Sequence, residues 1–137
     1  MTVLEYIERS NYAEQIKNMF RKSGLDYFLN RWAHKCKLIS EGFYFVIDEY
    51  INELHVRSYI DPVMEHCEAA ETDRAKMERL DSIFMEYTVE ISYRLDRSEI
   101  KKTRDNWYYF RVPEYLIKDW YIDEGDIIGS GAGEQAH

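Results

Sequence analysis

Seven apolar residues recur at the spacing of an α-helix between residues 25 and 39, and this stripe constrains the fold more than any other feature of the chain. Its members are Leu25, Phe28, Leu29, Trp32, Ala33, Cys36 and Ile39. Side chains at these intervals share one face of a helix, and that face has to be buried against other elements. Gly24 and Gly42 flank the stripe, and Pro62 and Pro113 are the two prolines of the sequence. So few helix breakers favour helices over a β fold with many turns.

The same spacing predicts further helices before and after this stripe. The first is expected to begin at Thr2, where Glu5 completes a capping-box pattern, and to end at Ser23. Later helices are expected at residues 43–54, after Asp61–Pro62, from residue 72 or 73 to 95, and at 114–121. We therefore predict an all-α fold, a compact bundle of five to six helices that forms a single domain over residues 1–128.

Two segments depart from the helical pattern. Residues 107–112 are rich in strand formers, which indicate either a short strand or an aromatic-packed loop. Residues 129–137 are rich in glycine and are predicted to form a flexible C-terminal tail. The apolar stripes of the helices predict a core that includes Leu25, Phe28, Trp32, Val46, Tyr50, Leu54, Leu80, Phe84, Tyr87 and Ile91.

The charge of the chain is unevenly distributed. The net charge is −8, with 18 basic and 26 acidic residues, so a general nucleic-acid coat, which needs a basic footprint, is disfavoured. Residues 41–100 hold six basic and fifteen acidic residues, whereas residues 101–112 hold four basic residues and one acidic residue. The middle helices are therefore expected to carry an acidic face beside a small basic and aromatic segment.

The sequence predicts a cytoplasmic protein without a membrane partner. The first residues mix Glu with Arg and Lys and lack the apolar stretch of a secretory signal, and no run of about 18 apolar residues is present. Cys36 and Cys67 fall on the apolar faces of predicted helices, where buried free thiols are expected. A disulfide between the two stays an alternative, because sequence gives no Cα separation.

Twelve tyrosines and three tryptophans are the most unusual part of the composition. Such residues fill cores, and they also anchor the centres of protein interfaces. The candidate partner-binding residues are Trp107, Tyr108, Tyr109, Trp120 and Tyr121. The leading hypothesis is a non-enzymatic interaction module of the inhibitor, immunity or antitoxin type, which binds a protein partner, basic in character, through an acidic and aromatic helical surface. Self-association into a homo-oligomer is a further alternative.

A second hypothesis is a nucleotide-processing enzyme that holds Mg²⁺. The pairs Glu65-x-x-Glu68 and Glu78-x-x-Asp81 resemble the metal-binding pattern of the all-α nucleoside triphosphate pyrophosphohydrolases. The candidate ligands are Glu49, Glu53, Glu65, Glu68 and Asp81. Helical phase places Glu78 away from the apolar stripe and Asp81 on its flank, which favours a solvated acidic face. No cofactor is expected outside this alternative.

A third hypothesis is DNA binding through residues 107–126. Arg111, Pro113, Leu116, Gly125 and Asp126 have a spacing similar to one half of the AbrB-like swapped-hairpin DNA-binding domains. The resemblance implies a strand, a short helical turn and a second strand. It covers under a fifth of the chain, and the glycine-rich end does not supply the alternating strand that completes the hairpin. Nucleic acid is therefore not the expected partner, and no DNA-binding residues are assigned.

Catalytic signatures are sparse. The sequence shows no glycine-rich phosphate loop, no nucleophile elbow and no Ser/His/Asp or Cys/His pattern. His34 and His55 lie beside apolar stripes, where a histidine more often packs than catalyses. The sequence therefore favours a binding role over an enzymatic one.

Overall fold

The structure is a computed structural model, and it describes residues 1–129. In these residues six α-helices are accompanied by a small antiparallel sheet, which confirms the predicted helical fold with a short strand region. The α-helices are α1 (Val3–Arg9), α2 (Glu14–Ser23), α3 (Asp26–Ser40), α4 (Ile47–Ser58), α5 (Ile60–His66) and α6 (Glu71–Glu86). The strands are β1 (Thr88–Ile91), β2 (Arg111–Pro113) and β3 (Ile127–Gly129). Short 3₁₀ turns span Trp107–Phe110, Glu114–Leu116 and Glu124–Asp126.

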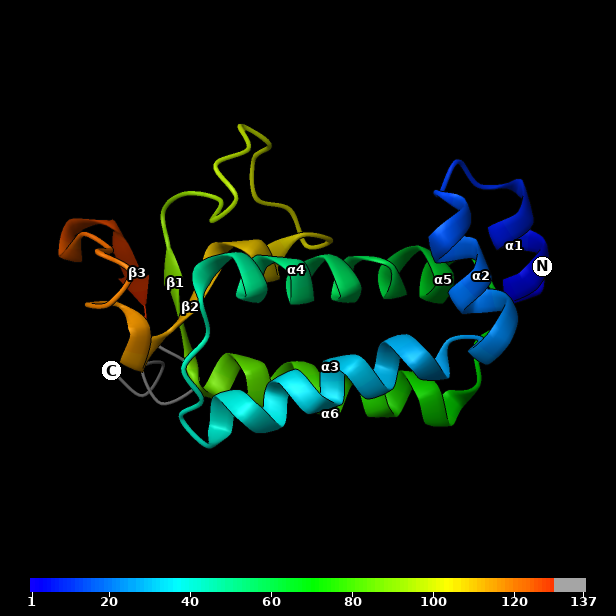
Figure 1. Ribbon diagram of the computed structural model, residues 1–137, viewed down its shortest axis with the longest axis horizontal. Coiled ribbons are helices and arrows are strands. Elements are labelled where there is room, and N and C mark those ends of the chain that lie inside the picture. Colours follow the sequence, from blue (N-terminus) through cyan, green and yellow to red (C-terminus); the bar gives the residue numbers. More distant parts are fainter. Residues whose placement is uncertain (130–137) are drawn as a thin grey trace.

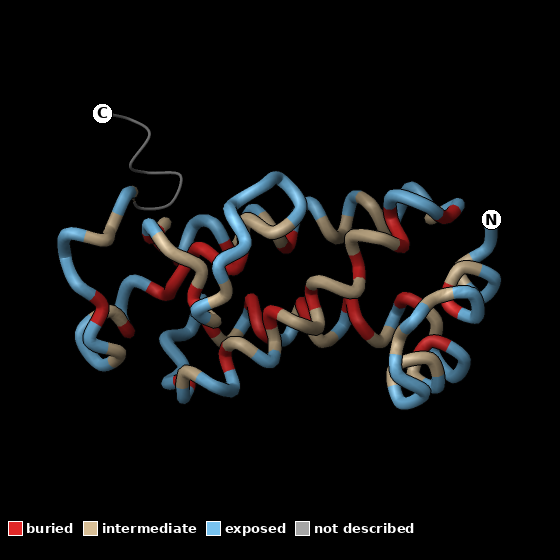
Figure 2. The backbone as a smooth tube through the Cα atoms, turned by 90° about the horizontal axis from the view of Figure 1, so that it is seen from above, coloured by how far each residue is buried: buried red, intermediate tan, exposed pale blue. Residues whose placement is uncertain are grey.

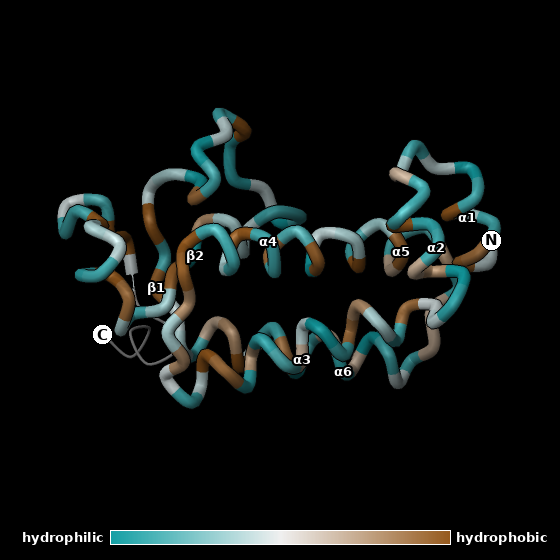
Figure 3. The backbone as a smooth tube through the Cα atoms, in the orientation of Figure 1, coloured by the Kyte–Doolittle hydropathy of each residue, from teal (hydrophilic) through white to brown (hydrophobic). Residues whose placement is uncertain are grey.

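The helices form two layers between two differently built ends (Figure 1). One layer holds α4 followed by α5, and the other holds α3 beside α6. The short helices α1 and α2 close one end, which we call the helical end, and the three strands close the other, which we call the sheet end. Hydrophobic and hydrophilic stretches alternate along α3, α4 and α6, as expected of amphipathic helices (Figure 3).

The predicted first helix is two helices. Thr2 caps α1 as expected, because its Oγ1 accepts a hydrogen bond of 3.1 Å from the backbone N–H of Glu5. The helix ends at Arg9, where the Ser10 hydroxyl donates to the carbonyl of Ile7 at 2.7 Å and the Ser10 backbone is extended. A serine hydroxyl that takes up a helix carbonyl competes with the next helical turn. α2 then ends at Gly24, as predicted; its φ of +60° is a value that glycine adopts without strain, but its ψ of −146° differs from the left-handed helical cap that was expected.

The longest predicted helix was expected to reach Leu95, where its apolar stripe ends. The observed helix α6 ends nine residues earlier, at Glu86. Thr88 stops it, since its Oγ1 donates to the Phe84 carbonyl at 2.7 Å. The Arg111 guanidinium, far away in sequence, donates to Thr88 Oγ1 at 2.8 Å and to the Thr88 carbonyl at 2.9 Å. The chain then continues as β1, which is rich in the β-branched residues that favour strands.

The strand order is β2-β1-β3, and both pairings are antiparallel. Val89 is opposite Val112, and Ile91 is opposite Ile127. The strand expected within residues 107–112 is therefore present from Arg111, but its first part is a 3₁₀ turn. β2 and β3 flank β1 and do not pair with each other, so the described residues do not form the hairpin implied by the DNA-binding resemblance. The helix expected at 114–121 is a 3₁₀ turn over Glu114–Leu116 followed by turns. Gly129 ends β3, and the rest of the predicted tail lies outside the described residues.

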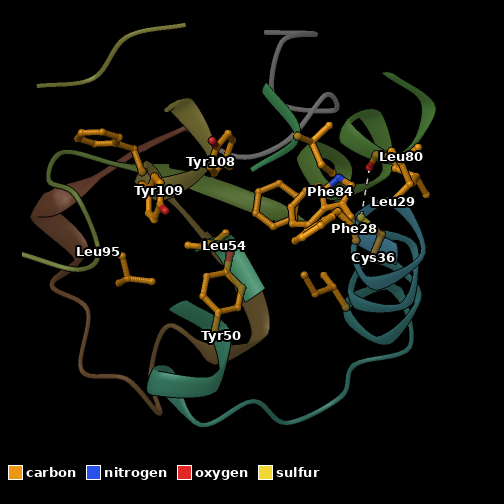
Figure 4. Close-up of a cluster of buried hydrophobic side chains, with 14 of the residues drawn as sticks. Phe28, Leu29, Cys36, Tyr50, Leu54, Leu80, Phe84, Leu95, Tyr108 and Tyr109 are labelled. Atoms are coloured by element: carbon orange, nitrogen blue, oxygen red, sulfur yellow. Dashed lines mark hydrogen bonds between the residues drawn. The ribbon is translucent and has the colours of Figure 1, made fainter. Parts of the chain in front are cut away.

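The core lies between the two helical layers and extends under the sheet (Figures 2 and 4). Eight of the ten predicted core residues are buried, namely Leu25, Phe28, Trp32, Tyr50, Leu54, Leu80, Phe84 and Ile91. The prediction is wrong for Val46 and Tyr87, which are 51% and 39% exposed. Both precede or follow a helix rather than belonging to it, so the helical phase used to place them does not apply. In the extended segment before α4, Phe45 is buried instead of Val46.

Cys36 and Cys67 are free and buried, as predicted. The Cys36 thiol donates to the Leu80 carbonyl at 3.4 Å (Figure 4), and burial raises the pKa of this thiol to about 12. A thiol in this state is a packing group rather than a nucleophile. No helix in residues 1–129 is long and apolar enough to cross a membrane.

Candidate functional site

The five candidate partner-binding aromatics do not share one exposed surface. Tyr108 and Tyr109 are buried, and Trp107 and Trp120 are half-buried. The hydroxyl of Tyr108 donates to Asp61 Oδ2 at 2.7 Å, and that of Tyr109 lies 2.6 Å from Nδ1 of His55. These two side chains belong to the core and are unavailable to a partner in this conformation. Tyr121 is 94% exposed and is the one member of the set that is fully open to solvent.

A different set of exposed apolar residues gathers at the sheet end. The loop before α4 exposes Phe43, Tyr44 and Val46, and the loop after β2 exposes Tyr115 and Tyr121. We call these five residues the aromatic surface. Sequence analysis identified only Tyr121 of this set. Residues 43–46 and Tyr115 were assigned to α-helices, whereas residues 43–46 are not helical and Tyr115 lies in a 3₁₀ turn.

Two hydrogen bonds fasten the two loops of the aromatic surface together. The hydroxyl of Tyr115 donates to the carbonyl of Phe43 at 2.6 Å, and the indole Nε1 of Trp120 donates to the carbonyl of Phe45 at 3.2 Å. The Trp120 ring also packs edge-on against the buried Tyr50 ring, with centroids 5.0 Å apart. The half-buried Trp120 therefore positions the surface, while the residues around it face solvent.

Tyr121 has a backbone conformation that is unusual for its side chain. Its φ of +55° is left-handed, a region that bulky residues rarely occupy. The strained turn is held by a hydrogen bond of 3.0 Å from the Ile122 N–H to the Ile117 carbonyl. Since the side chain is almost fully exposed, no packing inside the described chain explains why a tyrosine stands here.

The border of the aromatic surface is acidic. Residues 41–49 contain Glu41, Asp48 and Glu49, all exposed, and no lysine or arginine. Residues 114–124 contain four acidic residues and one lysine, Lys118. The sheet end thus combines exposed aromatic groups with negative charge.

A cavity of about 220 Å³ lies beside the aromatic surface and shares Phe43 with it. Its lining residues are His34, Lys35, Leu38, Phe43, Phe45, Glu49, Asn52 and Glu53. Among these residues His34, Glu49 and Asn52 are exposed, whereas Lys35 and Phe45 are buried. The cavity is therefore a pocket between α3 and α4, open to solvent at one side.

Lys35 is 1% exposed, which is rare for a lysine, and the sequence analysis did not single it out. It falls within the apolar stripe of α3, between Trp32 and Cys36. Its Nζ donates to the carbonyl of Tyr50 at 2.7 Å and lies 3.6 Å from the centre of the Tyr50 ring. The rings of Trp32, Phe45 and Phe84 lie within 5.8, 5.8 and 6.0 Å of the same atom. Burial holds the pKa of Lys35 well below its usual value, while the carboxylate of Glu53 favours the charged form.

The predicted metal ligands are not brought together. Glu49, Glu65 and Glu68 are exposed, and Glu53 forms an ion pair with Arg31. Asp81 accepts hydrogen bonds from Nε1 of Trp32 at 2.9 Å and from Arg57 at 2.8 and 3.0 Å. In the part of the chain that the structure describes, no group of three or more His, Cys, Asp or Glu residues is placed to hold a metal ion.

Arg57 is a second buried cation that the sequence analysis did not identify. Its guanidinium pairs with Asp81 of α6 and, at 2.6 Å, with Asp61 of α5. It also lies 4.9 Å from the centre of the Tyr108 ring. The carboxylates of Asp61 and Asp81 both accept hydrogen bonds from Arg57. This network therefore connects the two helical layers, and its carboxylates are not free to bind a metal ion.

Comparison with protein-family models, with curated proteins and with solved structures gave no match.

Proposed function

We propose that this protein is an interaction module of the inhibitor, immunity or antitoxin type, which binds a basic protein partner through the aromatic surface. One observation carries the proposal: two loops at the sheet end are hydrogen-bonded into one surface that exposes Phe43, Tyr44, Val46, Tyr115 and Tyr121. Large aromatic side chains of this kind supply much of the binding energy of protein interfaces.

The proposal gives the exposed tyrosines a physical role. Tyrosine buries a large apolar area at a low cost in side-chain entropy and keeps a hydroxyl for a polar contact. Strained backbone at an exposed residue is typical of binding sites, and Tyr121 combines a left-handed φ with an exposed ring. Because Tyr115 and Trp120 fasten the loops before binding, less ordering remains to be done when a partner arrives.

The charge around the surface specifies the partner's chemistry. Glu41, Asp48 and Glu49 border one loop, and the other loop is also predominantly acidic. Such a border accelerates the encounter with a positively charged protein and disfavours an acidic one. We place this interaction in the cytoplasm, which the two free cysteines support.

The test compares variants of the whole chain as baits in an extract of the cells that produce it. The double variant Tyr44→Ser/Tyr121→Ser removes two anchors of the aromatic surface, and Leu4→Ser removes an exposed apolar residue of α1 at the helical end. We expect a basic protein to be retained in stoichiometric amount by the wild type and by Leu4→Ser, but not by the double variant. The retained protein, once purified, should rebind with the same pattern.

Two outcomes contradict the proposal. One is that no stoichiometric partner is retained, and the other is that the double variant retains the partner as well as the wild type does. A second copy of the chain is another occupant of the same surface. Sedimentation of the purified chain distinguishes it, because self-association that is lost in Tyr44→Ser/Tyr121→Ser would assign the surface to a homo-oligomer instead.

A further inference from the structure

Lys35 is a buried amine with one hydrogen-bond acceptor in the described chain. The ammonium group of a lysine has three N–H donors, yet Nζ of Lys35 donates only to the carbonyl of Tyr50. The aromatic rings around it attract a cation, but no carboxylate within residues 1–129 forms an ion pair with it. Buried amines of this kind lose their charge readily and then act as nucleophiles or bases.

Lys35 is one of the residues that line the cavity between α3 and α4. The cavity is lined by exposed polar side chains on both helices and by the buried residues Lys35 and Phe45. Nζ of Lys35 lies 5.8 Å from the centre of the Phe45 ring, so the amine is near the part of the wall that Phe45 forms. The buried amine therefore belongs to a residue that lines a pocket.

We propose that Lys35 is a nucleophilic amine that forms an imine with a small neutral aldehyde bound in this cavity. The lone pair of Nζ attacks the carbonyl carbon, and a proton moves from nitrogen to the carbonyl oxygen to give a carbinolamine. The C–O bond then breaks and the hydroxyl leaves as water with the second proton of the nitrogen. One amine and one aldehyde thus give one imine and one water, with no oxidant or reductant.

The surroundings of Lys35 support each requirement of this reaction. Attack needs the uncharged amine, and burial lowers the pKa of Lys35 and so favours that form at neutral pH. Proton transfer needs groups that give and take protons, and His34 and Glu53 line the same cavity. Arg31 forms an ion pair with the Glu53 carboxylate and so fixes its position.

The size and lining of the cavity restrict the size, polarity and charge of the aldehyde that can bind. About 220 Å³ is less than the roughly 300–1,000 Å³ of sites for drug-sized ligands, so only a small molecule fits. Leu38, Phe43 and Phe45 supply apolar contacts for a short alkyl group. The exposed carboxylate of Glu49 repels an anionic carbonyl compound such as glyoxylate, whereas the carboxylate of Glu53 is paired with Arg31. The cavity shares Phe43 with the aromatic surface and Glu49 with its border, but this inference does not require the proposed protein partner, because it concerns the chemistry of Lys35.

Reductive trapping tests the proposal on the full chain. Propionaldehyde and sodium cyanoborohydride are added at neutral pH, and each modified lysine is identified by peptide mass mapping. Burial favours the uncharged form of Lys35, so we expect Lys35 to be alkylated several-fold faster than the exposed Lys22 or Lys37. Alkylation confined to exposed lysines, with Lys35 unmodified, would overturn the proposal.

Two variants test whether the aldehyde reaches Lys35 through the cavity. Asn52→Trp introduces a large ring at an exposed position that lines the cavity, and Gln15→Trp makes the same kind of change at an exposed site on α2. We expect the first to protect Lys35 by about tenfold or more and the second to leave the rate unchanged. Equal rates at Lys35 in both variants would show that the cavity is not the route. Glyoxylate should label Lys35 more slowly than propionaldehyde, and the reverse order would contradict the neutral class of ligand.

Discussion

The guanidinium of Arg57 and the carboxylate of Asp81 form a two-point ion pair between the helical layers, with Nη2–Oδ2 at 2.8 Å and Nε–Oδ1 at 3.0 Å. Arg57 lies on α4 and is buried, and Asp81 lies on α6. The carboxylate that the sequence presented as a metal ligand is thus the counter-ion of a buried arginine.

Asp81→Ala should therefore destabilise the fold severely. The change leaves the buried guanidinium of Arg57 with Asp61 alone, and removing one partner of a buried ion pair costs about 3–5 kcal/mol of unfolding free energy. Glu78→Ala, at an exposed position one turn earlier on α6, should change stability by less than about 0.5 kcal/mol. Urea unfolding measures both variants, and similar values for the two would contradict the role given to Asp81.

Thr88→Val, at the junction of α6 and β1, should lower the free energy of unfolding. Valine keeps the shape and the strand preference of threonine, but it removes the Oγ1 that donates to Phe84 and accepts from Arg111. Leaving these buried groups unpaired costs roughly 1–3 kcal/mol. The matched variant Thr72→Val, exposed in the first turn of α6, should be close to neutral in the same unfolding experiment.

Lys35→Met should remove a pH dependence of stability. Because the pKa of Lys35 is lowered in the fold, the unfolded chain binds more protons between the folded pKa and the ordinary lysine value, and stability rises with pH in that window. The slope that this one group adds is at most about 1.4 kcal/mol per pH unit. The difference in unfolding free energy between wild type and Lys35→Met should therefore change with pH below about 10, whereas that for the exposed Lys37→Met should be flat. A flat difference for Lys35→Met would show that the amine stays charged in the fold.

Tyr121→Asn should raise stability and weaken binding at the same time. Asparagine tolerates the left-handed φ of +55° better than tyrosine, which predicts a gain of a few tenths to about 1 kcal/mol. The same change removes the most exposed ring of the aromatic surface. Opposite signs in urea unfolding and in partner retention are expected, and a loss of stability would show that the tyrosine serves the fold.

The sequence predicts those parts of the fold that depend on local periodicity. The stripe from Leu25 to Ile39 identified α3 almost to its ends, because a long apolar stripe at helical spacing fits a helix and no other regular structure. The same rule failed at Tyr87, Ile91 and Leu95, whose spacing also fits a helix. What ends α6 there is the bond network of Thr88 with Arg111, which lies 23 residues further along the chain.

The site residues were less predictable for the same reason. Lys35 is placed by the carbonyl of Tyr50, 15 residues away, and Arg57 by Asp81, 24 residues away. No local pattern contains either pairing, and a charged residue within an apolar stripe is the one signal that could have pointed to Lys35. The aromatic surface depends on hydrogen bonds from Tyr115 and Trp120 that span more than 70 residues.

The most direct measurement of the central claim is a binding titration of the purified partner with the wild type, Tyr44→Ser/Tyr121→Ser and Leu4→Ser at low and at physiological ionic strength. The account predicts that the double variant binds at least about 30-fold more weakly, equivalent to about 2 kcal/mol, and that Leu4→Ser binds as the wild type does. It also predicts that salt slows association of the wild type, because the acidic border steers a basic partner. Equal affinities for all three chains would contradict the assignment of the aromatic surface as the binding site.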